Sequence, residues 1–363
     1  MLQAADSQWM AQALRLAERG LYTTSPNPRV GCVLVKNGAL VGEGWHERAG
    51  EPHAEVHALR AAGAAARGAT AYVTLEPCSH HGRTPPCADA LVAAGVARVV
   101  VAVQDPNPLV AGQGIAQLRA AGIQVECGLM EVAARELNIG FFSRMSRGLP
   151  WVRSKIAASL DGRTALANGV SKWITGAEAR SDVQHWRARS CAVLTGIGTV
   201  LADDPQLDVR DFETERQPLR VVLDSALHIS PKDRIVHGGK TLIYTAGADA
   251  EKHRALQACG AEVATLAGAN GKVDLAGVLR DLAQRGINEV LVEAGATLNG
   301  ALFRAGLVDE LVLYLAPQLL GDAARGMANL GELVQLEQRV ELAWQDVRHV
   351  GKDLRITARI KNV

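Results

Sequence analysis

The chain has 363 residues, a length that predicts about two domains. Hydrophobic residues make up 48% of it and charged residues 21%, a balance that provides a packed core and excludes disordered, collagen-like and coiled-coil proteins. Its formal net charge is +1, from 39 basic and 38 acidic residues, so the charge balance does not indicate nucleic acid as a partner.

The sequence also bears on the compartment. No uncharged apolar run approaches the roughly 18 residues that a membrane span needs, and residues 1–10 lack the basic flank and apolar run of a secretory signal. Six cysteines in so long a chain do not indicate a disulfide framework. We therefore expect a cytoplasmic protein without membrane contact, in which paired cysteines indicate metal binding or catalysis.

Residues 1–147 alternate between helix and strand patterns and form the first predicted domain. A helix with apolar residues on one face opens it and stops at Gly20. Short apolar strands and Ala-rich helices follow, the strands at residues 30–35, 71–75 and 99–103 and the helices near residues 53–66 and 87–94. Short strands separated by helices predict an α/β sheet with helices on both faces.

A break at residues 146–150 separates the second predicted domain, residues 148–363. Its patterns alternate again, with helices near residues 177–188 and 275–285 and strands at residues 151–157, 192–195, 220–223, 242–244 and 289–292. Residues 310–315 and 340–360 have strand patterns without helices. The second sheet is therefore predicted to be mixed.

The most informative residues for chemistry are His53, Glu55, Cys78 and Cys87. Pro52 is expected at the first helical position, which puts His53 and Glu55 on the first turn of a helix. Cys78 follows the end of a strand, where α/β sheets place their sites. One imidazole and two thiolates make a three-ligand zinc site with an open position for water, whose pKa zinc lowers to about 7. Glu55 is then placed to move protons without binding the metal.

Other interpretations of these residues stay open. The pattern H-x-E followed by P-C-x-x-C is typical of zinc deaminases, but here eight residues rather than two separate Cys78 from Cys87. A purely structural zinc is the alternative, and it would need a fourth protein ligand. Rival ligands are His57, His80 and His81. The cysteines without partner spacing are expected in the core, and these are Cys32, Cys127, Cys191 and Cys259.

Longer motifs carry a specific resemblance. They read TSPNPRVG at residues 24–31, EPCSHHGRTPPC at residues 76–87, KIAASLDGR at residues 155–163 and TGIGTVLADDP at residues 195–205. With these motifs the chain resembles the bifunctional riboflavin-biosynthesis deaminase–reductases over nearly its whole length. The resemblance implies an N-terminal cytidine-deaminase-like three-layer sheet and a C-terminal dihydrofolate-reductase-like mixed sheet. The long spacing between the cysteines is normal for this family.

For the first half the resemblance implies zinc-dependent deamination of a diaminopyrimidinone that carries a ribosylamino 5-phosphate. His53, Cys78 and Cys87 match the family's zinc ligands, and Glu55 would protonate a ring nitrogen and the departing amine. The amide of Asn27 matches a pyrimidine contact, since it can pair with both donor and acceptor edges of a ring. The further positions that match substrate contacts are His46, His80 and Arg83. For these three and for Asn27, an ordinary loop or capping residue is the alternative.

The residues of the second half do not by themselves predict a dinucleotide site, because no G-x-G-x-x-G follows a strand. Small-residue turns at residues 196–198 and 293–300 could bind phosphate with backbone N–H groups. An ordinary strand–helix turn is the favoured interpretation of both on the sequence alone. The resemblance reverses this preference, because the family's second half uses NADPH. It implies hydride transfer to the anomeric carbon of the ribosylamino group, which gives a ribityl chain.

The resemblance also assigns single residues of the second half. The positions that match NADPH contacts are Ala157, Trp173, Thr199, Asp203, Ser225, Gly295, Ala296, Thr297, Leu298, Asn299, Gly300 and Ala301. Those that match substrate contacts are Ser171, Arg187, Leu207, Arg210 and Glu293, and the arginines among them suit a phosphate. Lys155 and Asp203 are the candidates for proton transfer and orientation, with a solvated strand lysine and a turn aspartate as the alternatives. Many relatives carry Gly-Gly after the matching glutamate, where this chain has Ala294-Gly295.

The predicted function is thus a bifunctional enzyme that uses Zn²⁺ and NADPH and acts on a small phosphorylated pyrimidine. One alternative is a deaminase whose C-terminal domain does not reduce. Another is a nucleic-acid binder, which would need an aromatic-bearing basic groove and is disfavoured by an aromatic content of 4%. A third is a scaffold with a structural zinc. The oligomeric state stays open, and a homo-oligomer is compatible with the sequence.

Overall fold

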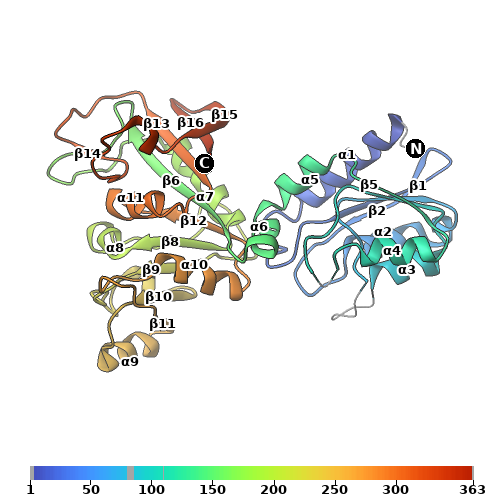
Figure 1. The fold of residues 1–363 in the computed structure, drawn as a ribbon, viewed down its shortest axis with the longest axis horizontal. Helices are drawn as coiled ribbons and strands as arrows, with labels where there is room; N and C mark the ends of the chain where they lie inside the picture. The colour runs from blue at the N-terminus through green and yellow to red at the C-terminus, as the bar shows by residue number, and fades with distance from the viewer. Residues whose placement is uncertain (1–3, 80–85, 109, 362–363) are drawn as a thin grey trace. The chain divides into compact units, whose positions relative to one another are not determined.

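The computed structural model describes residues 4–79, 86–108 and 110–361. The chain divides into two compact units, Met1–Gly148 and Leu149–Val363, and Figure 1 shows the elements of each. No helix within the described ranges is long and apolar enough to cross a membrane.

The first unit is built on a five-stranded sheet with the order β2-β1-β3-β4-β5. Its strands are β1 Gly31–Lys36, β2 Ala39–Trp45, β3 Thr70–Val73, β4 Arg98–Val101 and β5 Gln124–Cys127. β1 pairs antiparallel with β2 and β3, whereas β3, β4 and β5 run parallel. The carboxyl ends of three parallel strands therefore meet at one edge of this sheet.

Helices cover both faces of this sheet. They are α1 Ala4–Glu18, α2 Ala54–Ala62, α3 Cys87–Ala94, α4 Gln113–Ala120, α5 Glu131–Leu137 and α6 Ile139–Arg147, with a short 3₁₀ helix, η1, at Gly63–Ala66. Figure 1 shows α1 and α5 on one face and α2, α3 and α4 on the other. Gly31 permits the close approach of α1, because a Cβ atom there would lie 2.0 Å from the carbonyl oxygen of Ala13. The predicted three-layer arrangement is confirmed.

The second unit contains a nine-stranded sheet with the order β11-β10-β9-β8-β12-β6-β13-β16-β15. Its strands are β6 Trp151–Ser159, β8 Ala192–Gly196, β9 Leu219–Leu223, β10 Thr241–Thr245, β11 Ala261–Thr265, β12 Glu289–Glu293, β13 Glu310–Ala316, β15 Leu342–Val350 and β16 Asp353–Ile360. The strands from β11 to β13 are parallel neighbours, and β16 is antiparallel to β13 and β15. The prediction of a mixed sheet is confirmed.

Helices also pack on both faces of the second sheet. They are α7 Ala177–Arg189, α8 Ile197–Asp203, α9 Ala250–Ala258, α10 Leu275–Gln284 and α11 Ala296–Arg304. Neighbouring residues of β8 show the two faces, since Leu194 packs in one core with Leu279 and Leu302 while Val193 packs in another with Val200 and Leu256. Smaller elements are β7 Arg163–Ala165, which pairs with β14 Arg325–Gly326, and the 3₁₀ helices η2 Arg234–Val236 and η3 Leu336–Gln338.

The cysteines without metal spacing do not all lie in the core. Cys32 and Cys191 are buried, as expected, but Cys259 is half-buried and Cys127 is exposed. The prediction for Cys127 is wrong because it ends β5, a four-residue strand at the edge of its sheet.

Candidate active sites

The first site lies at the N-terminal end of α2. His53 directly precedes α2, Cys78 lies in the segment after β3, and Cys87 is the first residue of α3. The Nδ1 atom of His53 lies 3.6 Å from the Cys78 sulfur and 3.3 Å from the Cys87 sulfur. The three candidate ligand atoms all lie within 4.8 Å of one another. The fold therefore brings one imidazole and two sulfurs from three segments to one point.

These distances fit a tetrahedral zinc ion. Zinc bonds of about 2.3 Å to sulfur and about 2.0 Å to nitrogen place nitrogen and sulfur about 3.5 Å apart. Hydrogen bonds with Cys87 and His53 lower the pKa of Cys78 below its ordinary value. A lowered pKa favours the thiolate, the form that binds metals. With three protein donors, a fourth position on the metal is left for water or substrate.

Glu55 lies beside this group in the first turn of α2 and is 3% exposed. Its Oε2 atom has no hydrogen-bond partner among the described residues, and burial raises the pKa of the carboxyl above its ordinary value. A buried oxygen without a hydrogen-bond partner lowers the free energy of unfolding by about 1–3 kcal/mol, and such atoms in native structures often have a functional role. Glu55 is not among the three candidate ligands, so its carboxyl is available for proton transfer to a bound molecule.

The start of α2 differs from the prediction. The helix begins at Ala54, so Pro52 lies outside it and His53 is its N-cap, with extended backbone angles (φ −76°, ψ 167°). The His53 carbonyl accepts the first helical hydrogen bonds, from the N–H groups of Val56 and His57. Of the rival ligands, His57 does not belong to the ligand group. The rivals His80 and His81 and the predicted substrate residues His80 and Arg83 lie outside the described residues.

Asn27 and His46, both predicted substrate residues, are joined to this site. His46 is 2% exposed, and its ring meets that of His53 edge-on at 5.2 Å between centroids. Its Nδ1 lies 3.1 Å from the carbonyl oxygen of Pro52, which can only accept, so Nδ1 carries the proton. Its Nε2 then accepts from the Asn27 amide nitrogen at 3.1 Å. This leaves the Asn27 amide oxygen as an acceptor for a donor edge of a ring.

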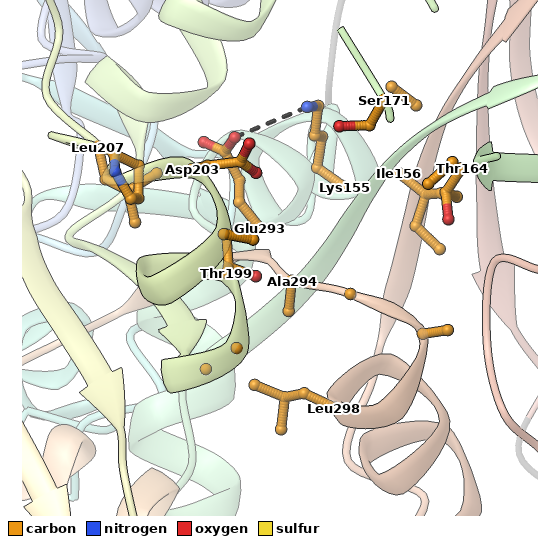
Figure 2. A pocket seen from close by; sticks show the side chains of 18 of the residues that line it. Lys155, Ile156, Thr164, Ser171, Thr199, Asp203, Leu207, Glu293, Ala294 and Leu298 are labelled. Carbon is orange, nitrogen blue, oxygen red and sulfur yellow. Dashed lines mark ion pairs between the residues drawn. The ribbon is translucent and has the colours of Figure 1, made fainter. Parts of the chain in front are cut away.

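The second site is a cavity of about 1500 Å³ at the carboxyl ends of β6, β8, β9 and β12 (Figure 2). Figure 2 shows Lys155 and Glu293 facing each other, with Asp203 beside Glu293 and with Leu298 farther away, near the bottom of the view. Most residues predicted for this half line the cavity: Lys155, Ala157, Ser171, Trp173, Arg187, Thr199, Asp203, Leu207, Arg210, Ser225, Glu293, Gly295, Ala296, Thr297, Leu298 and Ala301.

Two predicted residues, Asn299 and Gly300, do not line the cavity. The Asn299 amide donates to the carbonyl oxygens of Ala294 and Met327 at 3.0 and 3.4 Å. A Cβ atom at Gly300 would lie 2.1 Å from the carbonyl oxygen of Asn329. Both residues instead hold the start of α11 against the neighbouring loop, which fixes the turn at residues 294–298 beside the cavity.

A buried charge cluster forms the centre of the cavity wall. The Arg187 guanidinium donates two parallel hydrogen bonds to the Glu293 carboxylate, with Nε–Oε1 and Nη2–Oε2 distances of 2.6 and 3.0 Å. Lys155 Nζ lies 3.6 Å from Glu293 Oε2 (Figure 2). Burial alone would raise the pKa of Glu293, but Arg187 and Lys155 lower it to about 2. Glu293 is therefore ionised at neutral pH. Burial lowers the pKa of the neighbouring Lys155 below its ordinary value.

The structure also shows site residues that the sequence did not identify. Lys172 pairs with Asp203 at 3.1 Å, and Gln184 accepts the Arg210 backbone N–H at 3.2 Å. Both Lys172 and Gln184 line the cavity. Lys172 directly follows Ser171, a predicted substrate contact, so its position next to Ser171 in the sequence could have identified it as a cavity residue. Gln184 lies in a polar stretch of α7 and carries no such signal.

Comparisons with protein families agree with the two sites. Residues 3–103 match the family described as the cytidine and deoxycytidylate deaminase zinc-binding region. Residues 150–356 match the RibD C-terminal domain. Because both halves are matched, the alternative of a lone deaminase is not favoured.

Whole-chain relatives support the same grouping. The chain is 52% identical to the riboflavin biosynthesis protein RibD of Escherichia coli over 96% of this chain and 98% of that protein. It is similar to the solved structure of Acinetobacter baumannii RibD (form 1), with 49% identity, a TM-score of 0.92 and coverage of 98% and 99%. A Thermotoga maritima structure described as a diaminohydroxyphosphoribosylaminopyrimidine deaminase/5-amino-6-(5-phosphoribosylamino)uracil reductase matches at 33% identity and a TM-score of 0.88, with the same coverage. The chain therefore belongs to the RibD family and is a bifunctional riboflavin-biosynthesis enzyme, a zinc-dependent deaminase and an NADPH-dependent reductase.

Proposed function

We propose that the chain deaminates 2,5-diamino-6-(5-phosphoribosylamino)pyrimidin-4(3H)-one and then reduces the ribosyl group of the product to a ribityl chain. Residues 1–147 carry the first reaction and residues 148–363 the second. The observation that carries this proposal is the convergence of His53, Cys78 and Cys87 beside the buried, unpartnered oxygen of Glu55. The second reaction is supported by the cavity around Lys155 and Glu293.

In the deaminase site, His53, Cys78 and Cys87 would hold the zinc. Bound zinc supplies an activated water at neutral pH. Glu55 would deliver protons to a ring nitrogen and to the departing amine, a role that its buried carboxyl suits, with Oε2 lacking a hydrogen-bond partner among the described residues. Asn27 orients the pyrimidine ring through its amide, which the neutral His46 ring holds in place. The roles of His80 and Arg83 at the substrate and its phosphate rest on the family resemblance.

In the reductase site, Lys155, Asp203 and Glu293 orient the substrate and handle protons. The Arg187 guanidinium already donates two hydrogen bonds to Glu293, so the main role of Arg187 is to hold this carboxylate in position. Arg210 is 55% exposed and pairs with Asp208 at 3.2 Å, and because its guanidinium is more accessible than that of Arg187 it is the better phosphate ligand. Ser171 and Leu207 complete the substrate contacts.

The rest of the cavity would hold NADPH, which when bound would supply the hydride. Its contacts are Ala157, Trp173, Thr199, Asp203 and Ser225 together with the turn at Gly295–Ala301, although Asn299 and Gly300 act there by shaping the turn. Backbone N–H groups at the start of α11 are suited to its phosphates.

We also propose the partners and the location of the protein. The substrate is a phosphorylated small molecule, nucleic acid is not a partner, and the protein acts in the cytoplasm. A homo-oligomer is supported by the exposed side chains of Trp344 and Val347 on β15, the edge strand of the larger sheet. Light scattering on the full chain distinguishes an oligomer from a monomer.

Zinc removal tests the division of labour within the full chain. We expect a chelator to stop ammonia release from the diaminopyrimidinone, while NADPH oxidation continues when the deaminated intermediate is supplied. The two reactions are followed separately, by an ammonia assay and by NADPH absorbance. Restored ammonia release on adding Zn²⁺ is the control for reversibility. Ammonia release that survives complete removal of zinc would refute the deaminase mechanism, and an absence of NADPH oxidation by folded protein would refute the reductase assignment.

A further inference from the structure

Glu76 is a buried acidic residue that none of the proposed catalytic steps uses. It lies two positions before Cys78, in the segment between β3 and α3, and is 3% exposed. Its carboxylate accepts three backbone hydrogen bonds: Oε2 from the N–H groups of Asp105 and Gly112 at 3.1 and 2.9 Å, and Oε1 from that of Ile115 at 3.1 Å. Hydrogen bonds to an ionised acceptor are about twice as strong as neutral ones. The carboxylate is therefore strongly attached to the segment 105–115.

Two of these bonds cap α4 from another part of the chain. Gly112 is the N-cap of α4 and has no side chain to accept the free N–H groups of the first turn. Glu76 accepts the N–H of this N-cap residue and that of Ile115, the third residue of α4. A carboxylate is also favoured at the positive end of the helix dipole. The start of α4 and the segment before Cys78 thus depend on the same carboxyl group.

Close packing reinforces this attachment. A Cβ atom at Gly114 would lie 1.9 Å from the carbonyl oxygen of Pro77, the residue between Glu76 and Cys78. No side chain fits between α4 and this segment, so α4 supports the Pro77 backbone directly.

Cys78 is supported from the other side by α3. The N–H of Cys87 donates to the Cys78 sulfur at 3.3 Å, and the N–H of Ala88 donates to the Cys78 carbonyl oxygen at 3.1 Å. The Cys78 segment is therefore held between α3 and α4, and on the α4 side the Glu76 carboxylate makes the hydrogen bonds. A shift of this segment would change the 3.6 Å distance between the Cys78 sulfur and His53 Nδ1.

We propose that Glu76 is a positioning residue of the zinc site, which fixes Cys78 at the distance that the metal requires by capping α4. This inference rests on the proposed assignment of His53, Cys78 and Cys87 as zinc ligands. Groups that orient metal ligands from outside the first coordination shell typically contribute about 10–100-fold to metal affinity or activity.

The variant Glu76→Gln removes one of the acceptors without changing the size of the side chain. A glutamine has one carbonyl oxygen, so its NH₂ group must face at least one of the three N–H donors. We expect zinc affinity of the full chain to fall about 10–100-fold and the thiolate absorption band of the cobalt(II)-loaded chain to shift. NADPH oxidation with the deaminated intermediate stays unchanged and reports on the second unit.

Three comparison variants make the test decisive. Gly114→Ala places a Cβ atom against the Pro77 carbonyl oxygen and 3.3 Å from Glu76 Oε1, so it displaces the same segment by steric pressure, and we expect the same loss of zinc affinity. Asp6→Asn is the matched control, since Asp6 is a 2% exposed acid of the same unit that accepts from Tyr72 on β3 and Arg98 on β4. We expect the melting temperature of this variant to fall while its zinc affinity holds. Cys78→Ser serves as the reference for the ligand assignment itself.

The outcomes separate the two claims. If Cys78→Ser binds zinc normally, the zinc-site assignment fails. If Cys78→Ser loses zinc but Glu76→Gln and Gly114→Ala keep full affinity and an unshifted cobalt band, the positioning role of Glu76 is refuted. A loss of affinity in these two variants no larger than in Asp6→Asn, at equal melting temperature, would refute it as well.

Discussion

Replacing Glu55 by Gln should lower the deaminase kcat by about 10²–10⁴-fold, the range that a positioned general acid–base group contributes. The amide keeps the size of the side chain but cannot accept a proton from water and return it to the substrate. Zinc should stay bound at one ion per chain, because the three candidate ligand atoms come from His53, Cys78 and Cys87. Ammonia release and zinc content of the same preparation measure the two effects.

Two internal comparisons accompany this variant. Reduction of the supplied deaminated intermediate should proceed at the unaltered rate, which shows that the second unit is folded. Glu43→Gln, an exposed residue on β2 of the same unit, should leave deamination intact. Deamination retained at more than a tenth of the normal rate in Glu55→Gln would contradict the role assigned to Glu55, and loss of zinc would make Glu55 a ligand.

Replacing Glu293 by Ala should disrupt both the stability and the activity of the reductase unit. The change leaves Arg187 and Lys155 buried without their carboxylate partner, and breaking a buried pair in this way costs about 3–5 kcal/mol. Because Glu293 also fixes two side chains of the cavity wall, the reductase kcat/KM should fall about 100-fold. Denaturant unfolding and NADPH oxidation are the measurements.

The stabilisation of the fold by Glu293 should decrease as the pH falls. The pKa of Glu293 is lowered to about 2 from an ordinary value of 4.5, so its ionised form stabilises the fold by about 3 kcal/mol. This stabilisation is fully present above pH 4.5 and is lost as the pH falls toward 2. The stability difference between the unaltered chain and Glu293→Ala should therefore shrink by roughly half between pH 5 and pH 3.

Glu289 offers the matched control for Glu293. It lies at the other end of β12, is 1% exposed and pairs with Arg153 and Arg189, and it does not line the cavity. Glu289→Ala should cost a similar free energy of unfolding but leave kcat of the remaining folded enzyme nearly unchanged. Equal losses of kcat in both variants would show that Glu293 acts on stability alone.

Elements with strong local signals were predictable from the sequence. The helix near residues 87–94 coincides with α3, because apolar and Ala residues precede Gly95, whose left-handed backbone (φ 69°) ends the helix. The central strands of both sheets are continuous apolar runs and were likewise found. Around the metal site, the residue types themselves indicated the chemistry, since few combinations other than one histidine and two cysteines suit a catalytic zinc.

Elements that depend on tertiary packing were not predictable. β2 contains Gly42 and Gly44, which look like strand breakers, yet a Cβ at either position would lie 2.4 Å from α2, at the Ala58 oxygen or the His57 Cβ. In α9 only Leu256 is buried, so no apolar face marks the helix. Glu76 looks like a surface residue in the sequence, because its partners lie about 30 to 40 residues further along the chain.

The most direct test of the central claim is zinc X-ray absorption spectroscopy on the full chain. We expect the spectrum to show two sulfur neighbours of zinc at about 2.3 Å and two lighter neighbours at about 2.0–2.1 Å, a nitrogen of His53 and a water oxygen. Cys87→Ser should remove one sulfur from this shell. A first coordination shell of zinc without sulfur, or one made of four protein ligands with no position for water, would contradict the proposed catalytic site.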